Sequence, residues 1–516
     1  MATGYLVREN RYYDSVFLMQ VAQRISDETG VDEVAALMGT VNNKQLLADI
    51  GFEDPSVRAA SPSDLVIAIR AVDQETVGRI LDNVERWLAR PEKVAGRRAV
   101  RTLDQALESQ PQTNLVVISV PGTYAPRETK QALERGRSVF LFSSNVSVED
   151  ELRLKQLAHQ HGLILMGPDC GTAIISGRGI GFANVVRRGP IGTIGAAGTG
   201  LQELTSLVHQ LGSGVSHAIG TGGRDLSDSI GGLTTLDALS QLEADPSTKV
   251  LAIVSKPPGS ATLAHLRKIL SRASKPVVAC FLGLESIVDV QIGSLHLART
   301  IDEAAESATR LATGADSRVS GLSPKNDEQR LEAERVKLGR KQKFVRGIFA
   351  GGTLCYQAQQ VMRDLGLAVS SNVPLAGMAA LEDPHHSRGH TLVDIGDDLF
   401  TRSRPHPMID ATLRSERIIK EASDPEAAAL LLDFVLGYNA SPDPVGDLLG
   451  AINEAKSIAE ADGRHLNVVA SICGTDEDPQ DRKSQIKLLE SANVVVFPSN
   501  AQAAYFAGSL VSGLTP

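Results

Sequence analysis

Short apolar runs alternate with amphipathic stretches along most of this chain, and that alternation predicts its fold. Residues 64–71, 115–120 and 250–254 are nearly continuous apolar runs, which is typical of strands buried on both faces. Residues 73–88 and 201–211 repeat apolar side chains every three or four positions, which predicts amphipathic helices. Strands and helices take turns, so we expect an α/β fold of several parallel sheets joined by right-handed crossovers.

The same pattern gives a set of expected elements along the chain. The expected strands are 5–8, 31–38, 64–71, 115–120, 138–142, 163–166, 191–194, 215–219, 250–254, 277–282, 345–350, 390–395, 428–436, 466–472 and 494–497. The expected helices are 14–29, 73–88, 102–108, 125–135, 148–161, 201–211, 233–242, 261–272, 354–365, 445–462 and 500–507.

Five segments follow from these elements. Residues 1–92 run β-α-β and then β-α, which predicts a small α+β domain of the split βαβ type, a kind that is as often regulatory or oligomerising as catalytic. Residues 99–180, 190–314 and 346–516 each alternate strand and helix and are expected to form parallel-sheet domains. Residues 315–345 carry many charges of both signs, which favours a solvated helical linker over a nucleic-acid-binding segment.

Glycine-rich turns follow several of the expected strands. Four turns of this kind lie at residues 195–200, 220–225, 351–353 and 437–440. The N–H groups at a helix start lack helical partners and attract anions, and ligands of open α/β sheets bind at the carboxyl edge, where such turns lie. The first two turns therefore indicate a phosphate or other anion site, although plain tight connections have the same pattern.

Composition and charge exclude some classes of protein. Lys and Arg number 52 against 61 Asp and Glu, and the net charge of -9 argues against a nucleic-acid partner, which would require a basic face. The four cysteines, Cys170, Cys280, Cys355 and Cys473, form no CxxC pair and are interpreted as reduced thiols of a cytosolic protein. The first residues lack the apolar core of a signal peptide, and no apolar run approaches roughly 18 residues, so we expect a cytoplasmic protein that does not enter a membrane.

Two other features have open interpretations. His385, His386 and His390, with His406 nearby, could bind zinc or nickel, but no cysteine completes a known spacing, and a loop that closes over the anion site is the favoured alternative. Cys170 stands beside the expected sheet edge. A nucleophile there would need a base and a lowered pKa, and no histidine is near in the sequence, so a packed thiol is favoured.

Several of these stretches together resemble a known family. Gly167-Pro-Asp-Cys-Gly171, the turns at 195–200 and 222–225 and the stretch 233–259 are similar to the α subunit of succinyl-CoA synthetase. The residues from Arg346 on, including Val393-Asp-Ile-Gly396 and Gly437, resemble the carboxyl domain of the β subunit of that enzyme. The match is greatest to the FdrA family, in which shortened relatives of both subunits are fused, and the resemblance covers roughly residues 100–310 and 346–510.

This resemblance implies a more specific fold for the three α/β segments. It implies a Rossmann-like domain of the CoA-binding type in residues 99–180. It further implies a flavodoxin-like domain of the synthetase α type in residues 190–314 and one of the β type in residues 346–516.

The chain departs from the synthetase at the positions that carry its chemistry. The stretch after Phe281-Leu-Gly283 has no GHAG loop, and the nearest histidine, His296, is expected to lie in a helical setting. Lys256 stands where the synthetase has a glutamate that supports its phosphohistidine. Residues 40–62 show no glycine-rich CoA loop, and no ATP-grasp domain is present. We therefore expect no cofactor, with CoA binding left open because its usual loop is not visible.

The FdrA family implies a subunit of an oxamate carbamoyltransferase of allantoin degradation. That enzyme exchanges a carbamoyl group between oxalurate and phosphate, giving oxamate and carbamoyl phosphate, and it works with two further protein subunits. The reaction requires that phosphate be held while it attacks, or leaves from, a carbonyl carbon. Amide groups at helix starts and one or two cations can do this without a covalent enzyme intermediate.

The turns and the resemblance together give the expected site residues. One turn would bind phosphate through its amides and a hydroxyl, and a second would bind it through amides and an arginine that can donate two hydrogen bonds. A lysine would supply a further positive charge. The carboxyl domain would contribute residues from the opposite side, by analogy with the paired helix starts of the synthetase. These residues are Gly195, Gly198 and Thr199; Gly222, Gly223 and Arg224; Lys256; and Gly437 and Asn439. Lys256 could instead be a surface lysine before two prolines, and Arg224 could form a salt bridge to Asp225 or Asp228.

Two other functions remain open from the sequence. An acyl-CoA synthetase or CoA-binding enzyme fits the distant relationship but lacks the histidine and the CoA loop. A scaffold or regulatory subunit would retain the fold and bind partner chains through the N-terminal domain and the linker. In each case we expect an oligomer, small anionic substrates and no membrane or nucleic-acid partner.

Overall fold

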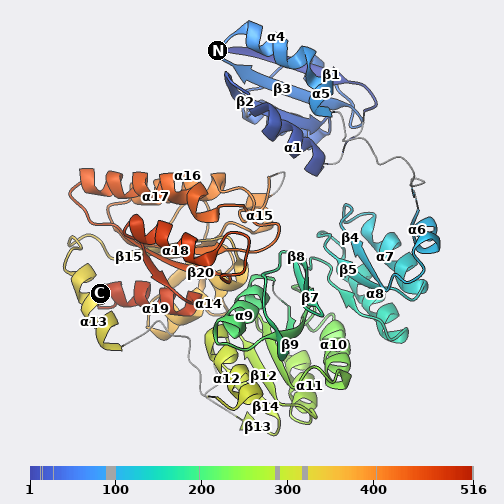
Figure 1. The fold of residues 1–516 in the computed structure, drawn as a ribbon. Helices are drawn as coiled ribbons and strands as arrows, with labels where there is room; N and C mark the ends of the chain where they lie inside the picture. The colour runs from blue at the N-terminus through green and yellow to red at the C-terminus, as the bar shows by residue number, and fades with distance from the viewer. Residues whose placement is uncertain are drawn as a thin grey trace. The chain divides into compact units, whose positions relative to one another are not determined.

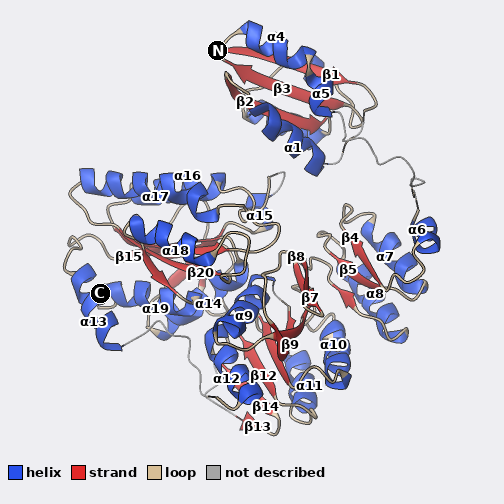
Figure 2. Cartoon of the chain, viewed as in Figure 1, coloured by secondary structure: helices blue, strands red, loops and turns tan. Residues whose placement is uncertain are grey.

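The computed structural model describes residues 1–11, 13, 15–26, 28–88, 100, 102–196, 198–284, 291–315, 324–401 and 404–513. The chain forms two compact units, Met1–Val100 on one hand and Arg101–Thr401 with Pro405–Pro516 on the other. The described strands make four sheets with helices packed against them (Figures 1 and 2). No helix in the described part of the chain is long and apolar enough to cross a membrane.

The first unit is built on one strand that is buried on both faces. The elements are β1 (Ala2–Arg8), α1 (Ser15–Ser26), β2 (Val31–Met38), α2 (Val41–Asp49), α3 (Pro55–Ala59), β3 (Leu65–Ala71), α4 (Gln74–Asp82) and α5 (Val84–Leu88). The sheet order is β1-β3-β2, with β3 antiparallel to both neighbours, so β1 and β2 form the predicted split βαβ unit. Ile67 and Ile69 of β3 pack with α1 and α4, whereas Val66 and Ala68 pack with α2 and α3.

The first unit also shows where the sequence prediction was wrong. The helix expected at 73–88 is interrupted at Asn83, whose side-chain amide donates to the carbonyl of Arg79 and so competes for the helical acceptor. Helices α2 and α3 were not predicted. Their N-caps were visible in the sequence as Thr40 and as Asp54 before a proline.

The second unit begins with a small parallel sheet. The elements are α6 (Leu103–Ser109), β4 (Leu115–Ile118), α7 (Ala125–Glu134), β5 (Ser138–Leu141), α8 (Val148–Gln160) and β6 (Leu165–Met166). The order is β4-β5-β6 and both pairs are parallel, which confirms the predicted strands and their direction.

An eight-stranded sheet follows, with the order β13-β14-β12-β11-β9-β10-β7-β8. The elements are β7 (Thr172–Ile175), β8 (Arg178–Gly181), β9 (Arg188–Gly195), α9 (Gly198–Gln210), β10 (Val215–Gly220), α10 (Leu233–Ala244), β11 (Val250–Ser255), α11 (Ser260–Leu270), β12 (Val277–Phe281), β13 (Gln291–Ile292), β14 (Leu295–Ala298) and α12 (Ile301–Thr313). The central strands are parallel as predicted, but the antiparallel hairpin β7-β8 was not foreseen. His296 lies on β14, opposite Val278, and not in the expected helical setting.

A seven-stranded parallel sheet completes the chain, in the order β17-β16-β18-β15-β19-β20-β21. The elements are α13 (Pro324–Arg335), β15 (Phe344–Phe349), α14 (Gly352–Asp364), β16 (Val369–Ser371), β17 (Ala379–Ala380), β18 (His390–Asp394), α15 (Asp398–Thr401), α16 (Thr412–Ala422), β19 (Ala427–Val435), α17 (Pro444–Ala461), β20 (Asn467–Cys473), α18 (Arg482–Ser491), β21 (Val495–Phe497) and α19 (Asn500–Val511). Helices α16 and α18 were not predicted.

The charged segment 315–345 is more closely attached than a solvated linker would be. Arg335 of α13 donates to the carbonyls of Ser509 and Leu510 at the end of α19. Glu334 contacts His465 at 2.9 Å, and the buried Gln342 donates to the carbonyls of Ala427 and His465. The sequence correctly indicated a helix here, but its polar side chains fix it to the seven-stranded sheet.

Polar side chains join the two larger sheets. Asn184, between β8 and β9, donates to the carbonyl of Leu436 at 2.9 Å and to Asp478 at 2.8 Å. Glu203 of α9 accepts the N–H of Asn500, the first residue of α19, at 2.8 Å, and its second oxygen is buried without a partner in the described structure. The two sheets therefore pack through a contact that includes a buried carboxyl group.

The buried Glu203 predicts a pH dependence of stability. Burial, with a smaller contribution from Asp302 and Asp433, raises the pKa of its carboxyl from 4.5 to about 8. A carboxyl whose pKa is higher in the folded state stabilises the fold at low pH, and that contribution is lost as the pH rises from about 4.5 through about 8. Glu203→Gln should therefore flatten the decline of Tm toward alkaline pH and unfold at a higher temperature than wild type at pH 9.

Thermal unfolding from pH 5 to pH 9 measures this effect. Glu454→Gln, on the exposed surface of α17, is the matched control and should follow the wild-type curve. Parallel Tm curves for wild type and Glu203→Gln would contradict the prediction.

Candidate functional site

The two larger sheets each reverse their strand order at one strand, and a glycine turn follows that strand in both. In the eight-stranded sheet β9 lies between β10 and β11, and in the seven-stranded sheet β15 lies between β18 and β19. Ligands of open α/β sheets bind at such switch points, outside the carboxyl ends of the strands. The helices that leave these two strands are α9 and α14.

The starts of α9 and α14 meet across the contact between the sheets. A methyl group on Gly200 would lie 2.6 Å from Thr353 Cγ2, and one on Gly351 would lie 2.7 Å from Thr199. Glycine is therefore required on both sides of the contact. The first amides of each helix have no helical partners, and in α14 the first helical hydrogen bond runs from Cys355 N to the carbonyl of Gly351. Two helix N-termini thus converge and favour an anion between them.

Asp433 fixes the turn before α14. Its carboxylate oxygens accept the N–H groups of Ala350 at 2.8 Å and Gly351 at 3.0 Å. Arg414 donates to one of the same oxygens at 2.9 Å and to the carbonyl of Ile348 at 3.0 Å. Because Asp433 already binds the N–H groups of Ala350 and Gly351, the amides left for a ligand are those of residues 352–354.

Lys256 follows β11 and lies at this junction. Its Nζ is 5.0 Å from the ring centroid of Tyr356 on α14 and 3.9 Å from the position of a methyl group on Gly352. In the described part of the chain it makes no ion pair or hydrogen bond, so its charge is available to a ligand. The sequence analysis expected Lys256 to supply a cation to the anion site, and that role stays a prediction.

Asp394, the last residue of β18, lies against the start of α14. A methyl group on Gly352 would be 2.5 Å from its Oδ2. Burial raises the pKa of this carboxyl to about 7, Asp397 and Asp433 contribute to the rise, and Lys256 opposes it. The sequence analysis cited this residue only for its resemblance to a synthetase motif. The signal available in the sequence was an Asp at the end of an apolar run, two residues before a glycine.

Asp169 is a second carboxyl near Lys256 that sequence reasoning missed. It has a left-handed backbone with φ of 56°, and burial raises the pKa of its carboxyl to about 6 although part of the residue is exposed. Asp398 raises this pKa further, whereas Arg224 and Lys256 lower it. Its place in the phrase Gly167-Pro-Asp-Cys-Gly171 was the only sequence signal.

The second glycine turn is not a helix start. Seven residues lie between Asp225 and Leu233, where α10 begins. Asp225 is fully buried and accepts the N–H groups of Thr234 at 3.1 Å and Thr235 at 3.0 Å, so the turn itself caps α10. The expectation that Gly222 and Gly223 offer helix-start amides is therefore corrected.

Arg224 is held by α8 and does not present a free fork. Its Nε donates to Glu151 at 2.9 Å, and a second nitrogen donates to the carbonyl of Val146 at 2.8 Å. Lys155 contacts Glu151 at 3.0 Å and Asp225 at 2.7 Å in the same buried cluster. A salt bridge was the alternative for Arg224, but its partner is Glu151 and not Asp225 or Asp228.

The turn after β19 contacts the eight-stranded sheet away from the start of α9. A methyl group on Gly437 would lie 2.6 Å from the carbonyl of Ala183, and the N–H of Gly437 donates to Gln480 at 3.1 Å. Asn439 donates to the carbonyl of Gly181 at 2.7 Å. Gly437 and Asn439 therefore join the sheets, and the helix start that faces α9 is α14.

Gly195 and Gly198 lie in the turn between β9 and α9, as the sequence analysis expected. Gly195 ends β9 and its carbonyl accepts the N–H of Thr221 at 2.8 Å, while Gly198 is the first residue of α9. The structure thus brings Gly198, Thr199 and Lys256 to one junction.

The histidine-rich stretch has local partners. His386 contacts Asp383 at 2.6 Å, and the buried His390 ring accepts the N–H of Val345 at 3.2 Å. His406 accepts the N–H of Met408, and burial lowers the pKa of its ring to about 4. Among the described residues no three His, Cys, Asp or Glu side chains form a group that could hold a metal ion.

All four cysteines are free and buried. The Cys170 thiol contacts the carbonyl of Thr172, and burial raises its pKa to about 12. It is a packed neutral thiol, as favoured from the sequence, since a nucleophile would need a lowered pKa.

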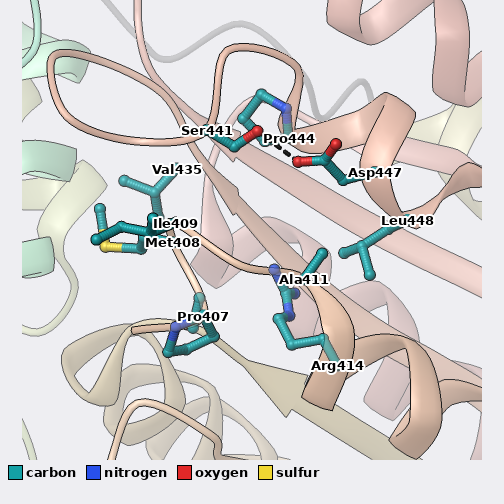
Figure 3. Close-up of a pocket in the computed structure, with 11 residues that line it drawn as sticks. Pro407, Met408, Ile409, Ala411, Arg414, Val435, Ser441, Pro444, Asp447 and Leu448 are labelled. Carbon is teal, nitrogen blue, oxygen red and sulfur yellow. Dashed lines mark hydrogen bonds between the residues drawn. The ribbon is translucent and has the colours of Figure 1, made fainter. Parts of the chain in front are cut away.

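A small cavity borders the turn before α14, and a larger one lies away from this junction. Figure 3 shows one of about 10 Å³ near Arg414, Val435 and Asp447, which has room for about one water molecule and is too small for a substrate. A larger one of about 840 Å³ lies where β20 and β21 begin, lined by Lys456 and His465 among others. It is at the amino edge of the sheet, opposite the edge where α/β proteins bind their ligands.

Comparison with known families and proteins agrees with this architecture. Residues 187–283 match the model of the CoA binding domain and residues 348–510 that of the CoA-ligase family. The chain is 43% identical over 518 residues to the uncharacterized protein YahF of Escherichia coli, covering 99% of each. A succinate–CoA ligase subunit alpha of Aquifex aeolicus is 27% identical over 37% of this chain and 63% of that protein. CoA-binding and CoA-ligase segments are thus fused in one chain.

A solved structure resembles the chain more loosely. The apo form of a dinucleotide-forming acetyl-coenzyme A synthetase from Ca. Korarchaeum cryptofilum is 16% identical, covers 77% of this chain and 82% of its own, and superposes with a TM-score of 0.32.

The N-terminal unit matches a family described as AllF, heavy metal-associated domain, over residues 1–105. That segment contains no cysteine and no histidine. Soft heavy metals require thiolate or imidazole ligands. The residues of this chain therefore do not fit a metal site of that kind, and the match concerns the domain's fold.

The close approach at the start of α14 predicts a strict need for glycine. Gly352→Ala would place a methyl group 2.5 Å from Asp394 Oδ2 and should destabilise the protein by about 1–3 kcal/mol and abolish phosphate binding. Gly450→Ala on α17 is the control, because no atom lies within 4 Å of the added methyl and the change should stabilise the helix by up to about 1 kcal/mol. Thermal unfolding and phosphate titration measure both; equal behaviour of the two variants would contradict this geometry.

The Arg224 contacts predict a structural role. Arg224→Ala removes one of the two cationic partners of the buried Glu151 carboxylate, the other being Lys155, and should lower Tm by several degrees, whereas Arg153→Ala, which breaks an exposed pair with Asp150, should not. If Arg224→Ala keeps the wild-type Tm but loses phosphate affinity, Arg224 binds the ligand after all.

Proposed function

This chain belongs to the family of the Escherichia coli protein YahF, and on that premise we propose that it is a subunit of an oxamate carbamoyltransferase. In this proposal it transfers a carbamoyl group between oxalurate and phosphate, giving oxamate and carbamoyl phosphate in allantoin catabolism. It acts with two other protein subunits and needs no organic cofactor. The observation that carries the proposal is the meeting of the α9 and α14 starts beside Lys256, which has no ion pair among the residues that the structure describes.

The charge of the junction suits an anion that is not first bound to a histidine. Two helix N-termini and Lys256 supply positive potential where a phosphate group would be held. His296, the nearest histidine in the sequence to the missing loop, lies on β14, where its backbone pairs with Val278 of β12 and Gln291 of β13. Direct attack by phosphate on a carbonyl carbon requires neither that histidine nor a nucleotide.

The substrates fit the same chemistry. The amides of residues 352–354 and the Thr199 hydroxyl can donate to phosphate oxygens, and Lys256 can offset the charge that develops as the tetrahedral centre forms. Donors fixed in the fold before the substrate arrives need not reorganise during the reaction.

A second candidate is an acyl-CoA ligase. The matches of residues 187–283 and 348–510 to the CoA-binding and CoA-ligase families favour it. The lysine at position 256 disfavours it, because the synthetase supports its phosphohistidine with a carboxylate there. A scaffold subunit is the third outcome that an experiment must separate.

The test is carbamoyl phosphate formation from oxalurate and phosphate by this chain, co-produced with its two proposed partner subunits. Lys256→Ala should lower kcat/KM by a factor on the order of a hundred or more, since a charge-assisted contact to the transition state is lost. Lys268→Ala, on the exposed surface of α11, is the matched control and should retain wild-type activity.

Other outcomes point to the alternatives. An active wild-type complex with an unchanged Lys256→Ala variant would favour a scaffold role for this chain. No carbamoyl phosphate, together with tight CoA binding by calorimetry, would favour the acyl-CoA ligase.

A further inference from the structure

Asp394 has a position that the proposed anion site does not explain. Its side chain is only 6% exposed, and its Oδ1 accepts the N–H of Gly396 at 2.9 Å. Its Oδ2 has no hydrogen bond in the described chain and lies against the first residue of α14. A buried carboxylate therefore directs a free oxygen into the junction of the two helix starts.

The backbone around Asp394 is fixed by a side chain from a neighbouring strand end. The N–H of Asp394 donates to Asn372 Oδ1 at 2.9 Å, and Asn372 Nδ2 donates back to the carbonyl of Asp394 at 3.0 Å. Such a bidentate contact limits movement of the carboxyl group. A group that must meet a substrate in one geometry benefits from this support.

The neighbouring carboxylate has a different environment. Asp433 lies on β19, on the other side of β15, and its oxygens accept two amides and the Arg414 guanidinium. Asp433 is thus satisfied by the protein itself. Asp394 has one amide and, nearby, the Lys256 ammonium, so it is the carboxyl that remains able to exchange a proton.

We propose that Asp394 is the acid–base group of the site and transfers a proton between phosphate and the nitrogen of the leaving amide. This inference rests on the proposed carbamoyl transfer. A phosphate oxygen forms a bond to the ureido carbonyl carbon, and the bond from that carbon to the inner nitrogen of oxalurate breaks. The nitrogen takes the proton of Asp394 and leaves as the amide of oxamate.

This step consumes and releases equal numbers of protons. Monohydrogen phosphate loses its proton when it becomes carbamoyl phosphate, and that proton restores Asp394. The charges of oxalurate and phosphate equal those of oxamate and carbamoyl phosphate, so no external acid or base is consumed. In the reverse direction the same carboxylate removes a proton from oxamate nitrogen and returns it to phosphate.

The groups that face Asp394 keep it suited to this exchange. Burial raises the pKa of its carboxyl to about 7, Asp397 and Asp433 act in the same direction, and Lys256 opposes them. A methyl group on Gly396 would lie 2.7 Å from His406 Nε2 and 3.1 Å from Asp394 Oδ1, but burial keeps the His406 ring neutral by lowering its pKa to about 4. Efficient acid–base groups have a pKa near the working pH.

The test compares wild type with Asp394→Asn in the complex of this chain with its partner subunits. Asparagine keeps an oxygen for the Gly396 N–H but cannot transfer the proton, so kcat should fall by about 10²–10⁴ in both directions while KM for phosphate changes little. The wild-type rate should decline above about pH 7 with oxalurate and below about pH 7 with oxamate, and the variant should lose both limbs. Asp383→Asn, on an exposed loop, should behave as wild type.

A second readout is independent of turnover. Calorimetric titration of the full chain with inorganic phosphate, in buffers of different ionisation enthalpy at pH 7, should show uptake of a fraction of a proton by wild type and less by Asp394→Asn. An anion beside the carboxyl raises its pKa further, which causes the uptake.

The outcomes separate this inference from the proposed function. An active wild type whose Asp394→Asn variant keeps its kcat and pH profile overturns the role of Asp394 and leaves the function intact. A wild type without carbamoyl transfer overturns the function. In that case equal proton uptake by both forms also rejects Asp394 as the proton acceptor, and unequal uptake supports it as the proton-exchanging group of an anion site.

Discussion

Two contacts between glycine and threonine hold the candidate site together. Gly200 packs against Thr353 and Gly351 against Thr199, so the starts of α9 and α14 approach more closely than any side chain with a Cβ would permit. Each start carries a partial positive charge, and two such ends repel one another. The approach is stable only because carboxylates accompany it: Asp433 binds the amides that precede α14, and Asp394 lies at its first residue. An anion site of this type therefore includes its own negative groups, and their proton affinity becomes part of the chemistry.

The second glycine turn, at residues 220–225, serves a different purpose. Asp225 caps α10, and Lys155 and Arg224 connect the turn to α8 through Glu151. Buried charges that are paired in this way fix the positions of elements, but they leave no group free for a substrate. Of the two cations expected at the site, only Lys256 lacks a partner in the described chain. The small parallel sheet is thereby attached to the larger one, and the ligand-facing surface is confined to the junction of α9 and α14.

The sequence predicted what depends on local pattern. The apolar runs located most strands, and the run at 64–71 matched β3 to within one residue, because a strand buried on both faces leaves an uninterrupted signal. Helices α16 and α18 were missed because their apolar stripes are short and charged residues dominate them. The two late glycine turns looked alike in sequence. Only the strand order shows that the one at Gly351 leaves a switch-point strand and faces α9, whereas the one at Gly437 packs on Ala183.

The different roles of Asp394 and Asp433 follow from the same strand order. Strand β15 lies between β18 and β19, so carboxylates near the ends of those two strands flank the start of α14 from either side. On the β19 side, Arg414 of α16 donates a hydrogen bond to Asp433 and offsets its charge. On the β18 side the opposite charge comes from Lys256, which belongs to the other sheet and reaches the junction only because α9 and α14 meet there. One carboxylate is thus satisfied within its own sheet, and the other depends on the contact between sheets. Any change that separates the two helix starts would remove the cation from Asp394 and raise its proton affinity, which couples the packing of the domains directly to the proton exchange that the reaction requires.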